Sequence, residues 1–471
     1  MHNLVIGERR PRGQATIEVM EPAHARPLDE VAAAGAGDLE DAVAAAKKAF
    51  PSWAAMTPVA RADVLFKFAD VVRTHAEELA TLEARNVGKP IGGARWEAGH
   101  VAETLRYYAG AADKFFGQTI STKNPGIDIT FHEPLGVVGL IVPWNFPMVI
   151  ATWKIAPALA CGNTVVLKPA SLTPLTALRL GELALEAGVP PGVLNVIPGP
   201  GAAVGAALAS HPDVAKIGFT GETATGRAIM AAAAQTIKRV GLELGGKSPN
   251  IIFADVDIEE AAAQAVASVF DNAGQDCCAR SRIIVERSIA GRFVEALRAA
   301  TEALVVGEPL DTATQMGSLV SAGQRETVES YLEIGKKEGA QLICGGNRPE
   351  REGYFLRPAV FTKAQPRMRV VDEEIFGPVV VVLTFDTEEE AVALANDTIY
   401  GLSGSLWTND LKRGLRVARA VKAGNLSVNS SSSVYIQAPF GGYKQSGLGR
   451  ELGMHALEHY SEVKNVYFET R

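Results

Sequence analysis

Hydrophobic residues recur every three to four positions through residues 38–118, and this spacing predicts three helices. The first is DLEDAVAAAKKAFPSW, with Asp38 as the expected N-cap. The second, ARADVLFKFADVVRTHAEELATLEARNV, stops at a Gly-Lys-Pro sequence, and the third is VAETLRYYAGAADKFFG. Residues 119–133 change to alternating polar and β-branched side chains, which predicts an extended hairpin.

From residue 134 to about 250, short β-branched runs alternate with helical stretches. The runs are GVVGLIVP, TVVLKPA, VLNVIPG, VAKIGFTG and SPNIIFAD. Strand, glycine-bearing turn and helix, repeated in this way, predict a doubly wound parallel sheet. A second α/β series follows, with the strands RIIVERS, AQLICGG, YFLRPAVF and PVVVVLTF, and SEVKNVYFETR predicts one terminal strand.

Composition narrows the class of protein. The chain has 471 residues, enough for two or three domains, and its net charge of −7 gives no cationic footprint for nucleic acid or an anionic membrane. No apolar run reaches the roughly 18 residues of a membrane-spanning helix, and the first residues lack the zones of a signal peptide. The four cysteines show no zinc-type spacing. We therefore expect a cytoplasmic protein without a metal.

Two neighbouring cysteines carry the most informative chemistry. In FDNAGQDCCARSR, a Gly-Gln turn precedes Cys277 and Cys278. A thiolate can attack a carbonyl carbon, and the resulting adduct can collapse in either direction. An isolated cysteine pair is more often buried and inert, so the pair by itself does not establish a reactive site.

Two further segments offer a base and a hydrogen-bond donor. Glu243 lies between two leucines in LELGGKSP, where an apolar setting would raise its pKa and suit it to activate water. Asn145 lies in PWNFP, where two prolines restrain the loop and the amide can donate to an oxyanion. Taken alone, each has an ordinary structural explanation, as a helix charge and as a turn residue.

Together these segments resemble the catalytic signatures of the aldehyde dehydrogenase superfamily, in the family's order. The similarity extends to APFGGYKQSGLGRELG and so covers essentially the whole chain. It implies that Cys277, and not Cys278, is the nucleophile. It also implies that Glu243 is the general base and that Asn145 stabilises the oxyanion together with the Cys277 main-chain N–H.

The same resemblance implies NAD or NADP as cofactor. The residues that match the family's cofactor positions are Trp144, Lys168, Gly221, Gly226, Glu374 and Phe376. Of these, Gly221 and Gly226 bound FTGETATG, a turn that opens a helix and can present N–H groups to a pyrophosphate. The sequence GPGAAVG at residues 199–205 looks more like the usual dinucleotide fingerprint, but we interpret it as a decoy.

Ser171 departs from the pattern of many NAD-preferring members, which carry Glu three residues after the lysine that matches Lys168. A missing carboxylate removes repulsion against a 2′-phosphate. We therefore predict NADP use or dual specificity. The alternative, that serine is neutral and NAD still binds, stays open.

The substrate tunnel is expected to include Phe146, Asp271, Asp276 and Phe440. The string NAGQDC resembles dehydrogenases of aminoaldehydes such as 4-aminobutanal, and carboxylates there would attract an ammonium tail. The alternative is that either aspartate is paired with the neighbouring Arg280 or Arg282 and never contacts the substrate. The aromatic cage expected for betaine aldehyde looks incomplete, because Phe440 stands where such enzymes often have Trp.

The resemblance implies an α/β architecture in three parts. A Rossmann-like cofactor domain spans residues 1–115 and 135–247, an α/β catalytic domain spans 248–445, and a β bridging element is formed by 116–134 and 446–471. Edge strands of that element favour a homodimer or homotetramer.

Other functions were weighed for the same sequence. Within the superfamily they are a simple aliphatic or succinic semialdehyde dehydrogenase and a coenzyme A-acylating enzyme, against which Glu243 argues. Outside it they are a catalytically silent structural homologue and a plain cysteine hydrolase. The physiological aldehyde, the pathway and the choice between dimer and tetramer stay open.

Overall fold

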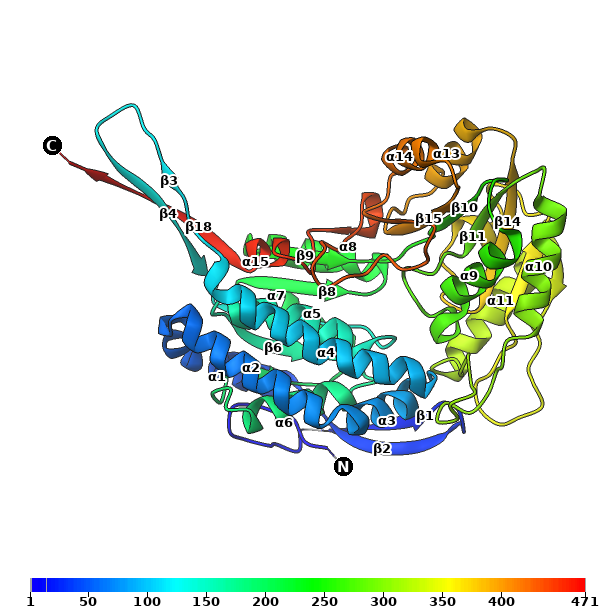
Figure 1. The fold of residues 1–471 in the computed structure, drawn as a ribbon. Helices are drawn as coiled ribbons and strands as arrows, with labels where there is room; N and C mark the ends of the chain where they lie inside the picture. Colours follow the sequence, from blue (N-terminus) through cyan, green and yellow to red (C-terminus); the bar gives the residue numbers. More distant parts are fainter. Residues whose placement is uncertain (1, 14, 471) are drawn as a thin grey trace.

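The computed structural model describes residues 2–13 and 15–470. Its centre is a six-stranded sheet in the order β17-β9-β8-β5-β6-β7, in which all neighbours are parallel except β17 and β9 (Figure 1). The strands are β5 (Val137–Ile141), β6 (Thr164–Lys168), β7 (Leu194–Val196), β8 (Lys216–Thr220), β9 (Arg239–Glu243) and β17 (Gly447–Leu448). The continuous burial of β5, β6 and β8 is typical of a parallel sheet covered on both faces.

A second, seven-stranded sheet has the order β12-β13-β14-β11-β10-β15-β16, with only the β12–β13 pair antiparallel. Its strands are β10 (Pro249–Ile252), β11 (Arg282–Glu286), β12 (Gln341–Cys344), β13 (Ala359–Thr362), β14 (Val379–Phe385), β15 (Ser403–Trp407) and β16 (Asn425–Val428). The prediction that SPNIIFAD belongs to the first sheet is therefore wrong, because its strand β10 pairs with β11 and β15.

Fifteen α-helices surround these sheets in the described part of the chain. The first eight are α1 (Ala36–Ala55), α2 (Pro58–Thr74), α3 (Ala76–Val87), α4 (Ile91–Ala111), α5 (Pro147–Ala160), α6 (Leu175–Glu186), α7 (Ala206–Ser210) and α8 (Thr223–Ala234). The others are α9 (Ile258–Phe270), α10 (Ala290–Glu302), α11 (Ala322–Glu338), α12 (Arg369–Asp372), α13 (Glu388–Asn396), α14 (Leu411–Ala420) and α15 (His455–His459). None of the helices in this part of the chain is long and apolar enough to cross a membrane.

A three-stranded antiparallel sheet projects from this body, in the order β18-β4-β3 (Figure 1). It consists of β3 (Thr119–Ile120), β4 (Gly126–Pro134) and β18 (Ser461–Glu469). The predicted hairpin and the predicted terminal strand are both confirmed. Near the N-terminus, β1 (Ala15–Glu21) and β2 (Arg26–Ala33) form a separate hairpin that the sequence analysis did not predict.

Three helix predictions need correction. The first helix is capped at Gly35, and Asp38 is its third residue, whose carboxylate accepts the Gly35 N–H at 2.9 Å. The second predicted helix is two helices that meet at His75, and α4 begins at Ile91, ten residues before the predicted third helix. Strands β9, β15 and β16 were also missed, because each is only four or five residues long and has no strong alternation.

Candidate active site

Three parallel strands of the six-stranded sheet end at one edge. The PWNFP loop follows β5, the turn before α8 follows β8, and Glu243 is the last residue of β9. The carboxyl ends of parallel strands are where open α/β sheets bind ligands. This edge therefore brings Asn145, Gly221 and Glu243 together, although nearly 100 residues separate the first from the last.

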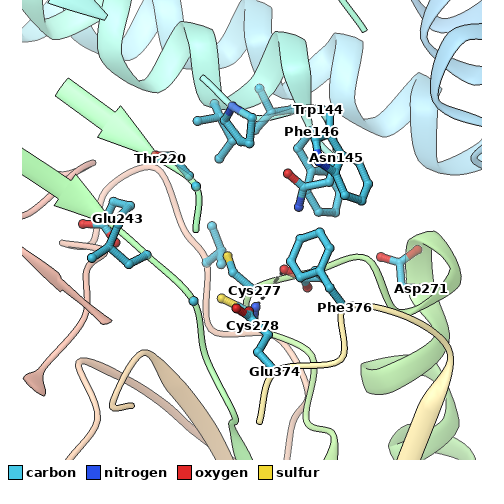
Figure 2. Close-up of a pocket in the computed structure, with 18 of the residues that line it drawn as sticks. Trp144, Asn145, Phe146, Thr220, Glu243, Asp271, Cys277, Cys278, Glu374 and Phe376 are labelled. Atoms are coloured by element: carbon cyan, nitrogen blue, oxygen red, sulfur yellow. Dashed lines mark hydrogen bonds between the residues drawn. The ribbon is translucent and has the colours of Figure 1, made fainter. Parts of the chain in front are cut away.

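A cavity of about 580 Å³ opens at this edge. Eleven of the predicted site residues line it: Trp144, Asn145, Phe146, Gly221, Glu243, Asp271, Asp276, Cys277, Glu374, Phe376 and Phe440. The remaining three, Lys168, Ser171 and Gly226, are not among its lining residues. Figure 2 shows the two cysteines between Glu243 and Asp271, with Asn145 and Phe376 facing them.

The segment that carries the cysteines has a strained backbone. After α9, Asn272 and Ala273 both have left-handed conformations, with φ of 48° and 56°. Such conformations are costly for residues other than glycine and are typical of functional sites. The next residue also has a positive φ, and a Cβ on Gly274 would lie 2.2 Å from the Gly377 carbonyl oxygen. A Cβ on Gly246 would lie 2.3 Å from the Cys277 carbonyl oxygen, so this segment is held on two sides.

The thiol of Cys277 is half-buried, whereas Cys278 is buried. The neighbouring Cys278 thiol and burial raise the pKa of Cys277 well above its usual value. The donor atoms of Asp276, Cys277 and Cys278 lie within 4.8 Å of one another, and Asp276 adds a further unfavourable charge. The structure therefore favours the neutral thiol, and the reaction needs a group that accepts its proton.

Glu243 is 4% exposed, and its Oε2 atom has no hydrogen-bond partner in the described part of the chain. Burial raises the pKa of Glu243 well above its usual value, and the nearby Glu451 adds to this, while Lys154 opposes it. Lys154 is itself paired with Glu451, at 2.6 Å. A carboxyl group with a raised pKa and a free oxygen is suited to proton transfer near neutral pH.

Asn145 is held in place from three directions. Its side-chain Nδ2 donates to the Gln275 main-chain carbonyl oxygen at 2.9 Å. Its main-chain carbonyl oxygen accepts from Asn272 Nδ2 at 2.9 Å and from Lys89 Nζ at 2.8 Å. A side-chain amide has two N–H donors, so one remains after the bond to Gln275. The side chain is 4% exposed and lines the cavity.

Neither tunnel aspartate forms an ion pair within the described residues. Asp271 accepts from the Asn272 N–H at 2.9 Å, and Asp276 accepts from the Cys278 N–H at 2.8 Å. Burial raises the pKa of Asp276, which is half-buried, whereas Asp271 is exposed. A cationic ligand would relieve this cost.

The arginines named as alternative partners are occupied elsewhere. Arg282 donates to the carbonyl oxygens of Lys247, Leu394 and Ala395, and Arg280 donates to the Cys278 carbonyl oxygen and to two serine hydroxyls. The charge of Arg280 still lowers the pKa of Asp276, but no hydrogen bond joins them.

The other end of the cavity suits a nucleotide. Glu374 Oε1 accepts the Gly246 N–H at 3.0 Å, and burial raises the pKa of Glu374 to about 7. The rings of Trp144 and Phe376 meet edge to face at 5.1 Å. At the turn into α8, the Thr220 and Thr223 hydroxyls are buried with no partner among the described residues. Unpaired donors at a helix N-terminus fit a bound phosphate.

Lys168 and Ser171 lie beside the sequence that was interpreted as a decoy. Ser171 Oγ donates to the Gly199 carbonyl oxygen at 3.1 Å, and a Cβ on Gly205 would lie 3.5 Å from the Lys168 side chain. Burial lowers the pKa of Lys168 to about 8, and its Nζ donates to the Pro169 carbonyl oxygen at 3.0 Å.

An aromatic group on the cavity wall was missed by the sequence analysis. The ring of Trp96 stacks on His100 at 4.8 Å, Trp153 Nε1 donates to His100 Nε2 at 3.0 Å, and Trp153 meets Phe440 edge to face at 5.1 Å. Trp96, Trp153 and Phe440 all line the cavity. The helical spacing of Trp96 and His100 was the available signal, but it is shared by ordinary core residues.

Comparison with known proteins agrees with this geometry. A model of the aldehyde dehydrogenase family matches residues 10–466. Betaine aldehyde dehydrogenase of Bacillus subtilis (strain 168) is 45% identical over 460 residues, covering 96% of this chain and 94% of that protein. The peroxisomal aminoaldehyde dehydrogenase 2 of Pisum sativum is 45% identical over 461 residues, covering 96% and 92%.

A solved structure agrees as closely. The crystal structure of betaine aldehyde dehydrogenase from Staphylococcus aureus in complex with NAD+ superposes with a TM-score of 0.98 at 40% identity, covering 100% of this chain and 95% of that one. The predicted fold class is thereby confirmed.

Proposed function

The chain belongs to the aldehyde dehydrogenase family, and we propose that it oxidises an aldehyde to the carboxylic acid through Cys277, with NAD+ or NADP+ as oxidant. The observation that carries this proposal is the half-buried Cys277 thiol on a cavity that is also lined by Glu243 and Asn145. A coenzyme A-acylating enzyme would have no use for a buried, partner-free carboxyl oxygen at Glu243.

The first step joins Cys277 Sγ to the aldehyde carbon. The thiol proton leaves to solvent water, and the carbonyl oxygen becomes an oxyanion that accepts from the free N–H of the Asn145 amide and from the Cys277 main-chain N–H. Because the structure favours the neutral thiol, this proton transfer is a demanding part of the step. The product is a thiohemiacetal on Cys277.

The second step removes a hydride from the thiohemiacetal carbon and leaves a thioester. The nicotinamide supplies the hydride acceptor when bound, and Glu374, Trp144 and Phe376 are the residues placed to hold it. Glu243 then takes a proton from water, whose oxygen attacks the thioester carbon. The carbon–sulfur bond breaks, the acid leaves, and the proton held by Glu243 passes to the Cys277 sulfur, which restores the thiol.

We propose NAD+ as a cofactor and NADP+ as an accepted alternative. Thr220 and Thr223 are placed for the pyrophosphate at the N-terminus of α8, and Lys168 and Ser171 for the adenosine ribose. Ser171 puts no carboxylate near a 2′-phosphate, and Lys168 offers a positive charge.

For the substrate we propose an aldehyde with a cationic tail, such as 4-aminobutanal. Exposed Asp271 and half-buried Asp276 line the cavity without an ion-pair partner, and burial removes part of the solvation of Asp276. An ammonium group would restore the lost stabilisation, whereas a carboxylate tail would be repelled.

A quaternary ammonium aldehyde is the second candidate. The rings of Trp96, Trp153 and Phe440 line the cavity and can face a cation. Phe440 is a poorer partner for a cation than the tryptophan expected in a complete cage, so we rank betaine aldehyde below 4-aminobutanal.

The test is a panel of four aldehydes assayed with NAD+ and NADP+ in parallel. They are 4-aminobutanal, betaine aldehyde, butanal and succinic semialdehyde. We expect kcat/KM for 4-aminobutanal to exceed that for succinic semialdehyde by about tenfold or more, with butanal between them. The Asp271→Asn variant should narrow this ratio and leave butanal nearly unchanged. The reverse ranking of the two charged aldehydes would refute the cationic tail, and strong exclusion of NADP+ would refute dual cofactor use.

We also propose that the chain assembles as a homodimer or homotetramer through its projecting sheet. Apolar Ile127, Phe131 and Phe468 are exposed on one face of the β4–β18 pair, and Val463 is exposed on the other face. An apolar face on an unpaired sheet edge is typical of a subunit interface. Light scattering of the purified protein distinguishes the two assemblies from a monomer.

A further inference from the structure

A buried cluster behind the cavity has no part in the reaction as proposed above. It consists of Lys89, between α3 and α4, with Glu83 of α3 and Glu97 of α4. All three side chains are at most 2% exposed. Buried ions are costly, so a fold that retains three of them needs a compensating reason.

The cluster is internally balanced. Lys89 Nζ donates to Glu97 Oε1 at 2.5 Å, Glu83 accepts from the Thr176 hydroxyl at 2.7 Å, and the other carboxyl oxygen of each glutamate is buried without a partner among the described residues. Burial raises the pKa of both glutamates, most strongly that of Glu97. With a proton on one glutamate, the Lys89 ammonium group and the remaining carboxylate would leave the cluster neutral.

Lys89 also reaches the loop that carries Asn145. Its Nζ donates to the Asn145 carbonyl oxygen at 2.8 Å and lies 4.1 Å from the centre of the Phe146 ring. The same carbonyl oxygen accepts from Asn272, in the strained segment before the cysteines. One carbonyl group thus joins the loop after β5 to the segment after α9.

The backbone around Lys89 is fixed as tightly as its side chain. Gly88 has a φ of 89°, and a Cβ there would lie 2.2 Å from the Ser318 hydroxyl. The Ser318 N–H donates to the Gly88 carbonyl oxygen at 3.0 Å. The lysine therefore extends from a rigid turn that contacts the part of the chain that follows α10.

We propose that Lys89 is a positioning residue for the oxyanion site. Its ammonium group holds the Asn145 carbonyl, and through it the orientation of the Asn145 side-chain amide, against the Cys277 segment. Lys89 does not line the cavity and reaches the reaction chiefly through the Asn145 carbonyl, while its charge also acts on Asp271 and its ammonium group contacts Phe146. This inference rests on the proposed role of Asn145.

The test is a double-mutant cycle between Lys89→Met and Asn145→Ala, measured by kcat/KM with the aldehyde that the panel ranks first. We expect Asn145→Ala to lose about 10²–10³-fold, as for the removal of one oxyanion donor. Lys89→Met should lose about 10–100-fold, as for a displaced catalytic group. The double variant should be no worse than Asn145→Ala within about threefold, because Lys89 then has nothing left to position.

Two further measurements separate positioning from general damage. Alkylation of Cys277 by iodoacetamide needs no oxyanion donor, so its rate in Lys89→Met should stay within about twofold of the parent protein. The matched control is Lys216→Met, which removes another buried lysine that makes no contact with this loop. Its effect should multiply with that of Asn145→Ala instead of vanishing.

A folding failure of Lys89→Met would not end the test. The charge-balanced variant Glu83→Gln/Lys89→Met removes one positive and one negative charge, and Glu83→Gln alone is its control. Losses of Lys89→Met and Asn145→Ala that multiply would overturn the inference. An Asn145→Ala variant with full activity would instead overturn the proposed oxyanion site, so the two failures are distinguishable.

Discussion

The two walls of the cavity are built in different ways. One wall consists of strand ends of the six-stranded sheet, where Glu243 follows a regular ladder of hydrogen bonds through β9. The other wall comes from irregular segments next to the seven-stranded sheet, where Asn272, Ala273 and Phe376 all have left-handed backbones. The regular wall presents the proposed base, and the strained wall presents the thiol.

The two walls position their proposed catalytic groups by different means. A strand end fixes a side chain through the packing of the whole sheet, so the groups on it are aimed without local strain. A sharp turn costs conformational energy but brings Cys277 out of the core while Cys278 stays inside it. Substitutions on the strained wall should therefore change activity by moving the Cys277 thiol. Substitutions on the regular wall should change activity by changing charge.

The largest effect should separate the two cysteines. We expect Cys277→Ala to lose about 10⁴-fold or more in kcat while the protein still binds cofactor, because no other group can form the thioester. Cys278→Ala should keep most of the activity. Steady-state kinetics and cofactor fluorescence measure both, and equal losses would contradict the assignment.

The next effect tests charge on the regular wall. Glu243→Gln should lower the rate of thioester hydrolysis by about 10²–10³-fold. In the parent protein this rate should increase as pH rises through the raised pKa of Glu243, and the variant should lose that increase. Because the folded protein binds this proton more tightly than the unfolded chain, ionised Glu243 costs stability above the raised pKa. Relative to the parent, Glu243→Gln should thus gain in Tm as pH rises. A Tm difference independent of pH would contradict this explanation.

A smaller effect is expected where the nucleotide lies against the six-stranded sheet. Ser171→Glu should lower kcat/KM for NADP+ about tenfold more than for NAD+, because the added carboxylate repels a 2′-phosphate. Ser171→Gln is the uncharged control. If both substitutions change the two cofactors equally, size and not charge is responsible.

The smallest effect tests the strain directly. Ala273→Gly should change the free energy of unfolding by less than about 0.5 kcal/mol, because relief of the left-handed backbone offsets the added flexibility of the unfolded chain. Ala265→Gly, in the regular helix α9, should cost about 1 kcal/mol or more. Urea unfolding compares the two, and equal costs would mean that position 273 carries no strain.

Much of the fold could be predicted because most elements are locally periodic. The helices of residues 38–118, the strands β5, β6 and β8 and the long strand β18 all follow their own hydrophobic pattern. The sheet to which β10 belongs could not be predicted, because SPNIIFAD reads as a buried parallel strand in either sheet. Its partners β11 and β15 are set by long-range packing.

The site residues also differ in whether a local sequence motif could predict them. Cys277, Glu243 and Asn145 were found through short motifs, and the structure brings all three to one cavity. Lys89 was named only as part of a helix stop, since a Gly-Lys-Pro sequence says nothing of an ammonium group that reaches Asn145. Trp96 was missed because a tryptophan on a helix has no signature of its own.

The projecting sheet also bears on how the chain is made. Register pairs Gly126 with Glu469 and Pro134 with Ser461, so β4 must wait for the synthesis of more than 300 further residues before β18 can pair with it. Until then a growing chain displays an open strand edge with apolar Ile127 and Phe131. A chain truncated before residue 461 would leave that strand edge without β18, so truncation there should raise the tendency of the chain to aggregate.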